Sequence, residues 1–249
     1  METFFSWSTD NRFALFSFPH LSALFTLGVM MLLIFCFRSD LKEKRANLAM
    51  RLMIATALLL SEGSFHLWFI YYSEWSITTT LPLQLSSISL LLSVALLITK
   101  QRRLFEITYF VGTSSALLAM ITPDLGFYSY PHFRFFHFFV AHGGIVLTSW
   151  LFIAVNKYIP SYRSIWTAFT TLNLYVAVLF AINLSIGSNY MFLINKPHSH
   201  TILDYLGPWP FYLLSLEGIT IIAFHLLYLP FYILKSYSFN RTTNRKSTI

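Results

Sequence analysis

PHFRFFHFFVAHGG, residues 131–144, places Arg134, His137 and His142 inside a segment that is otherwise almost entirely apolar. The apolar segment continues to about residue 156, which is long enough for a helix across the hydrocarbon core of a membrane. An ionisable side chain inside such a span costs on the order of several kcal/mol unless it is paired or hydrated. The stretch therefore predicts a membrane helix whose first half carries a functional polar cluster, with His142 as the first candidate.

The composition of the whole chain agrees with a membrane protein. Its 249 residues are 56% hydrophobic, 18% aromatic and only 11% charged, whereas a soluble domain carries roughly 25% charged residues. The net charge of +7 comes from basic residues in short loops, which fits membrane orientation and not nucleic-acid binding. The single Cys36 lies in an apolar run, so neither a disulfide framework nor a zinc motif is expected. Residues 1–17 lack the pattern of a cleavable signal peptide.

Seven segments are long and apolar enough to span the membrane as helices. They cover roughly residues 18–37, 49–72, 81–99, 105–123, 133–156, 165–187 and 209–234. The segments lack the period-two alternation of barrel strands, and no soluble domain fits between them. We predict an all-α polytopic membrane bundle that forms a single transmembrane domain over residues 1–249.

The positions of lysine and arginine predict the orientation of this bundle. Fourteen of the seventeen basic residues fall in loops one, three and five, at the adjacent helix start and in the C-terminal tail. By the positive-inside rule these parts face the cytoplasm, so the N-terminus lies outside and the C-terminus is cytoplasmic. We expect a multi-pass protein of the cell membrane.

With this orientation the strongly polar intramembrane residues all fall in the outer half of the membrane. Glu62 and His66 lie four residues apart and share one helix face. The other members are Gln84, Ser86, Arg134, His142 and Glu217, and the loop before the last segment adds Asn189, Tyr190 and Lys196. Their shared depth predicts one polar cavity that opens to the outer side.

Each candidate has a functional and a structural interpretation. His142 suits a general base, or it bonds a neighbouring helix as part of the packing. Ser86 suits a nucleophile that His142 activates, or it belongs to a small-residue packing face with Ser89 and Ser93. Glu62 or Glu217 would orient the histidine, or would pair with Arg134 or His66.

The remaining candidates concern substrate binding and metals. Arg134 and Lys196 suit an anionic head group such as a lipid phosphate, or they extend to the membrane interface. His198 and His200 form an HSH pattern without a clear third ligand, so we expect no metal site and no organic cofactor.

Five stretches together resemble one protein family: LPLQLSS, FEITYFVGTSSALLAMITPDL, PHFRFFHFFVAHG, GSNYMFLINKP and LGPWPFYLLSLEG. They resemble the bacterial YwaF-like integral membrane proteins, which are similar to the eukaryotic transmembrane protein 164 acyltransferases. The resemblance covers about residues 75–235. It implies a helical membrane fold related to the androgen-dependent TFPI-regulating and androgen-induced membrane hydrolases, and phospholipid acyl transfer through a cysteine and a histidine.

Carried over by position, the family histidine falls on His142 and the family cysteine falls on Ser86. The serine is a departure that either keeps the chemistry as an oxygen ester or marks a member that has lost activity. Asn189, Tyr190 and Lys196 match the outer loop of the family, and Gln84 and His66 would line the same substrate cavity.

The sequence therefore predicts a lipid-modifying enzyme that acts on membrane phospholipids by acyl transfer or hydrolysis. Two alternatives remain open. One is a non-enzymatic carrier or receptor for a lipid or small molecule, and the other is an envelope scaffold in which the polar residues only join helices. The sequence indicates neither a nucleic-acid partner nor an oligomeric state.

Overall fold

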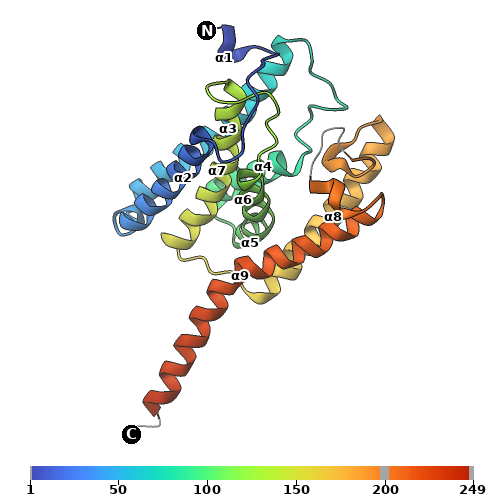
Figure 1. The fold of residues 1–249 in the computed structure, drawn as a ribbon. Coiled ribbons are helices and arrows are strands. Elements are labelled where there is room, and N and C mark those ends of the chain that lie inside the picture. The colour runs from blue at the N-terminus through green and yellow to red at the C-terminus, as the bar shows by residue number, and fades with distance from the viewer. Residues whose placement is uncertain (1, 197–201, 247–249) are drawn as a thin grey trace.

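The computed structural model describes residues 2–196 and 202–246, and within these ranges every regular element is helical. Figure 1 shows the helices gathered into a bundle, with the long last helix running away from it. The α-helices are α1 (Glu2–Phe5), α2 (Phe18–Cys36), α3 (Lys44–Tyr71), α4 (Leu85–Thr99), α5 (Arg102–Ile107), α6 (Ser114–Ile121), α7 (Phe133–Ala154), α8 (Tyr162–Ile186) and α9 (Phe211–Lys246). The short elements are η1 (Asp40–Lys42), η2 (Thr108–Thr113), η3 (Tyr190–Phe192) and η4 (Ile202–Leu206). His198 and His200 lie outside the described residues.

The prediction of an all-α membrane protein is confirmed. In the described part of the chain six helices are long and apolar enough to cross a membrane: α2, α3, the continuous helix Arg102–Ile121, α7, α8 and Phe211–Ser236 of α9. The predicted segment 81–99 forms the shorter α4, whose 15 residues would cover about 22 Å of a hydrocarbon core about 30 Å thick.

The chain from Ser76 to Gln84 is not helical, which explains why α4 starts later than predicted. The side chain of Tyr190 holds this stretch in place, because its hydroxyl accepts the Leu81 N–H at 2.9 Å and donates to the Ile77 carbonyl at 2.7 Å. Pro82 within the stretch has no N–H to offer a helix.

One end of the bundle joins the loops that were predicted to be cytoplasmic. The guanidinium of Arg51, at the start of α3, donates to the carbonyl of Leu97 near the end of α4. Tyr158, in the loop after α7, donates its hydroxyl to the Lys100 carbonyl at 2.7 Å. The opposite end joins the N-terminal segment to the loops around α3 and α7, for example through Trp68 Nε1, which donates to the Phe5 carbonyl at 2.7 Å.

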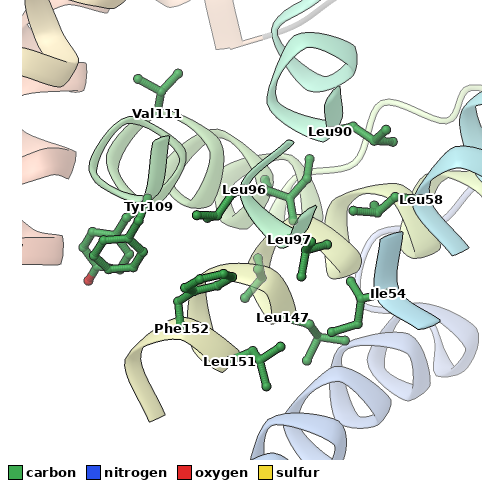
Figure 2. Packing of buried hydrophobic residues seen from close by; sticks show 14 of the residues in the cluster. Ile54, Leu58, Leu90, Leu96, Leu97, Tyr109, Val111, Leu147, Leu151 and Phe152 are labelled. Carbon is green, nitrogen blue, oxygen red and sulfur yellow. The ribbon is translucent and has the colours of Figure 1, made fainter. Parts of the chain in front are cut away.

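The centre of the bundle is an apolar core between α3, α4, η2 and α7 (Figure 2). Leu58 of α3 lies here fully buried against Gly144 of α7. A Cβ at position 144 would come 2.6 Å from Leu58 Cδ2, so glycine lets the two helices approach closely. Trp68 near the end of α3 packs its ring 6.1 Å from that of Phe133 at the start of α7. Helix α3 is therefore antiparallel to both α4 and α7, which run in the same direction.

Helices α8 and α9 form a second region beside this core. Figure 1 shows them crossing at the side of the bundle, with α4, α5 and α6 between them and α7. Helix α8 packs on α5 and η2, and α9 packs on α8. Helix α9 contains Pro230 and is bent in Figure 1.

Candidate functional site

His142 lies in the third turn of α7 with its side chain buried. Its Nδ1 lies 2.8 Å from the carbonyl oxygen of Phe138, one turn earlier, and the two rings are 4.2 Å apart. Because a carbonyl oxygen only accepts, Nδ1 carries the proton in a neutral ring, and Nε2 is left with its lone pair. Within the described part of the chain the hydrogen bond of His142 is made by Nδ1 and not by Nε2. His142 is thus held in the tautomer that a general base requires.

Arg134 lies two turns closer to the start of α7, among aromatic rings. Its guanidinium carbon is 4.5 Å from the ring centre of Phe65 and 5.8 Å from those of Trp68 and Tyr128. Nη1 lies 3.5 Å from His137 Nδ1, and Nε is buried without a hydrogen-bond partner. Among the side chains that the structure describes, those of residues 4–196 and 203–236, no carboxylate forms an ion pair with this guanidinium. A buried cation of this kind suits an anion supplied by a ligand.

Glu62 and His66 pair on one face of α3, as the sequence predicted. His66 Nε2 lies 3.6 Å from Glu62 Oε1, and this carboxylate oxygen is buried without a hydrogen bond. The ring of Phe65, between them in sequence, stacks on His137 of α7 at 4.6 Å. The structure therefore brings polar residues near the end of α3 together with those near the start of α7.

Ser86 is half-buried in the first turn of α4. Its position along the bundle axis relative to His142 follows from two contacts that lie one helical turn further along α4 and α7. A Cβ on Gly112 of η2 would lie 3.1 Å from Ile145 Cγ2 and 3.4 Å from Ser89 Cβ, so Ile145 and Ser89 stand at one level. Ser86 precedes Ser89 by three residues and His142 precedes Ile145 by three, on helices that run in the same direction. Ser86 and His142 therefore stand at the same level, although no hydrogen bond joins them in the described chain.

Gln84 and Tyr190 join the loop after α8 to the start of α4, and Asn189 stabilises this loop. Gln84 Oε1 accepts the Met191 N–H at 3.0 Å. Asn189 binds its own loop, since its Oδ1 accepts the Ile194 N–H at 3.0 Å. The hydroxyl of Tyr190 joins Ile77 and Leu81, and burial raises the pKa of this hydroxyl above its usual range. The polar atoms of these three residues are therefore engaged with the backbone.

Lys196 and Glu217 lie with the second region, on or beside α9. Lys196 Nζ is 5.5 Å from the ring centre of Tyr212. Glu217 Oε2 accepts a hydrogen bond of 3.0 Å from Asn173 Nδ2 of α8. The structure thus does not bring Glu217 to His142, and the Phe138 carbonyl occupies the position at Nδ1 that an orienting carboxylate would take.

A cavity of about 620 Å³ lies between α2, α3 and α7. Its α7 wall is a stripe at helical spacing that includes Phe136, Val140, Gly143 and Leu147. This stripe lies on a different face of α7 from His142, which does not line the cavity. The lining is almost wholly apolar, so this cavity is not the polar one that the sequence predicted.

Several buried polar residues were not singled out from the sequence, and His20 and Asn183 are two examples. His20 in the first turn of α2 is fully buried, with Nδ1 accepting the Phe16 N–H at 3.0 Å and Nε2 donating to the Met120 carbonyl at 2.8 Å. Asn183 of α8 is also buried and binds both the N–H and the carbonyl of Tyr190. The sequence signal was the same for these two as for His142, namely a polar residue in an apolar helix. Their partners are backbone groups far along the chain or in a loop, which a sequence does not reveal.

The chain belongs to the TMEM164 family, whose family model matches residues 15–228. This match includes the stretches with Ser86, Arg134, His142 and Glu217. No curated protein and no solved structure matches the chain.

Proposed function

We propose that this member of the TMEM164 family moves or removes acyl chains of membrane phospholipids at a site between α4 and α7. The observation that carries the proposal is the geometry of His142. Its Nδ1–H is fixed by the Phe138 carbonyl, while Nε2 is free in a buried environment at the level of the Ser86 hydroxyl. Serine and histidine in this relation are the parts that nucleophilic acyl transfer requires. Membership of the family supports the same chemistry.

The proposed reaction has two steps. His142 Nε2 takes the proton of Ser86 Oγ, which attacks the carbonyl carbon of a lipid ester. The tetrahedral intermediate collapses, and the lyso-lipid alcohol leaves with the proton from His142, so that the acyl chain becomes an ester on Ser86. In the second step a lipid hydroxyl or water gives its proton to His142 and attacks this ester, which frees Ser86. The acceptor decides between transferase and hydrolase.

Head-group binding is proposed for the residues above the reacting pair. Arg134 offers an unpaired guanidinium to a phosphate, with His137 beside it. Glu62 and His66 complete the polar wall on α3. Lys196, Gln84, Asn189 and Tyr190 stand at the neighbouring outer loop, where the last three keep that loop on the start of α4. Glu217 is proposed to stabilise the α8–α9 pair through Asn173.

The site would face the outer leaflet of a bacterial cell membrane, with seven passes and the N-terminus outside. Contacts at both ends of α4 support seven membrane-spanning helices although α4 is short. Gln84 at its start binds the proposed outer loop, and Leu97 near its end binds Arg51 at the opposite end of the bundle. The basic loops gathered at the Arg51 end support the orientation.

Mass spectrometry of lipids incubated with the purified protein tests the proposal. Wild type, Ser86→Ala and His142→Ala are compared in nanodiscs of mixed phospholipids. We expect lyso-lipid or transferred acyl chains with wild type, and loss of both products in each variant. Activity lost only in His142→Ala would keep the enzyme and remove Ser86 as its nucleophile. If the folded wild-type protein left the lipids unchanged, the result would contradict the proposal that the protein is an enzyme.

The apolar cavity favours a second candidate function, a carrier that holds one lipid chain without changing it. Its volume of about 620 Å³ lies in the range of about 300–1,000 Å³ that is usual for ligand sites. A carrier would release its lipid unchanged and would tolerate Ser86→Ala, which the same mass spectra would reveal. An envelope scaffold would also leave lipids unchanged, and would keep its function in His142→Gln.

A further inference from the structure

Two buried residues with hydroxyl side chains, Ser89 and Thr108, flank Gly112 one turn below Ser86 and His142. Gly112 belongs to the π-helical segment η2. A Cβ on Gly112 would lie 3.4 Å from Ser89 Cβ and 3.5 Å from Thr108 Cγ2, so both side chains pack closely around this glycine. π-Helical segments are rare and often occur at functional sites.

The hydroxyls of Ser89 and Thr108 have no hydrogen-bond partner among the described residues. Both residues are almost completely buried, with exposed fractions of 1% and 0%. Serine and threonine in membrane helices usually donate to the carbonyl one turn earlier. Ser93 and Thr148 of this chain do so, at 2.7 Å and 2.8 Å.

An unpaired hydroxyl in an apolar interior has lost its bonds to water and gained nothing in return. Two such hydroxyls around one glycine are free to donate hydrogen bonds to a ligand atom. Because Ser86 and Ser89 are three residues apart on α4, their side chains are neighbours on one helix face. The two unpaired donors therefore lie about one turn from the hydroxyl that is proposed to attack the ester.

We propose that Ser89 and Thr108 donate hydrogen bonds to the oxyanion that forms on the ester carbonyl oxygen during attack by Ser86. The inference rests on the proposed acyl transfer. Attack converts the carbonyl into a tetrahedral carbon with a negatively charged oxygen. Donors that are already in place and shielded from water stabilise this charge without having to reorganise.

The first test is the kinetics of Ser89→Ala, Thr108→Val and the double variant with phospholipid nanodiscs. Loss of one oxyanion donor typically lowers kcat on the order of 10²-fold. We expect a loss of that order for each variant with KM nearly unchanged. Ser93→Ala is the matched control, since Ser93 is equally buried on the same helix but donates to the Ser89 carbonyl. An unchanged kcat in the double variant would overturn the inference and leave the proposed function intact.

A second test separates oxyanion stabilisation from disturbance of the nucleophile. Ser86→Cys is made in a Cys36→Ala background, so that one thiol remains to react with iodoacetamide. Alkylation needs the thiolate that His142 generates, but its transition state carries no oxyanion. We expect Ser89→Ala and Thr108→Val to leave the alkylation rate unchanged while His142→Ala lowers it. Slowing of alkylation by the Ser89 or Thr108 variants would contradict an oxyanion role. Inactive wild type, with alkylation that does not depend on His142, would remove the proposed function and the inference with it.

Discussion

The α3–α4–α7 half of the bundle and the α8–α9 half both bury polar side chains, but the two halves differ in how many of the polar atoms have hydrogen-bond partners. Asn183 and Tyr190 of the second half bind backbone groups with nearly every polar atom. In the first half Arg134 Nε, His137 Nε2, Ser89 Oγ and Thr108 Oγ1 are buried without a hydrogen-bond partner within the described residues.

We call a polar group saturated when each of its polar atoms has a hydrogen-bond partner. Saturated groups stabilise the fold, because removing one leaves its partner unpaired. Buried polar groups without partners lower stability and are available to a ligand. The contrast predicts that substitutions in the first half change activity, and that those in the second half change stability.

The largest expected effect is on activity, from His142→Gln. We expect acyl transfer to fall on the order of 10³-fold, because glutamine cannot act as a base. The free energy of unfolding should change by no more than about 1 kcal/mol, since only one hydrogen bond is at stake. Lipid turnover and thermal denaturation measure the two quantities.

His20→Gln is the matched control, because both ring nitrogens of His20 are bonded to backbone groups. It should lower stability by about 2 kcal/mol and leave the activity of the folded protein unchanged. If His20→Gln lowered activity and not stability, the distinction between saturated and unsaturated histidines would be wrong.

The next effect is on stability, from Asn183→Ala. This substitution leaves the Tyr190 N–H and carbonyl and the Ser188 hydroxyl without their partner. Unpaired buried groups cost about 1–3 kcal/mol each, so we expect a loss of about 3 kcal/mol in all. Denaturation in detergent measures it. Asn173→Ala, which removes one partly buried bond to Glu217, should cost about 1 kcal/mol. Equal losses in both variants would argue against saturation as the cause.

A smaller effect is expected on lipid binding, from Arg134→Leu. Loss of the guanidinium should weaken binding of an anionic phospholipid about tenfold, which corresponds to about 1.4 kcal/mol. The stability of the fold should stay the same or rise, because a buried cation without a carboxylate partner is removed. Lipid binding at two salt concentrations measures the first quantity. A zwitterionic head group bound as tightly by the variant as by wild type would show that Arg134 binds no phosphate.

The all-helical membrane fold could be predicted from the sequence, because the length of the apolar segments follows from the transfer of side chains into a hydrocarbon core. The pairing of Glu62 with His66 was also predictable, since helical spacing fixes it. The partner of Glu217 and the saturation of Tyr190 were not, because they depend on how α8 crosses α9 and how the loop folds back. The π-helical segment could not be predicted either, since no residue pattern in 108–113 distinguishes it from an α-helix.

The smallest expected effect is a loss of stability at low pH, caused by His132 at the N-cap of α7. His132 Nε2 donates to the Ser6 carbonyl at 2.9 Å and Nδ1 accepts the Arg134 N–H at 3.1 Å, so both nitrogens are saturated in the neutral ring. Burial, opposed by the bond to Ser6 and aided by the charge of Arg134, lowers the pKa of His132 below its usual 6.5. The unfolded chain therefore binds this proton first as the pH falls. The stability that the neutral ring contributes is complete above pH 6.5 and declines below it.

Protonation of Nδ1 would break the cap and weaken the anchoring of the N-terminal segment. Proteolysis of that segment should thus be faster at pH 5 than at pH 7.5, and His132→Asn, which keeps a cap acceptor without titrating in this range, should remove the difference. Because both ring nitrogens of His132 bind other parts of the fold, the enzymatic activity of the uncleaved protein should not follow the pH profile of proteolysis. A profile shared by activity and proteolysis would mean that the N-cap of α7 also sets the position of Arg134.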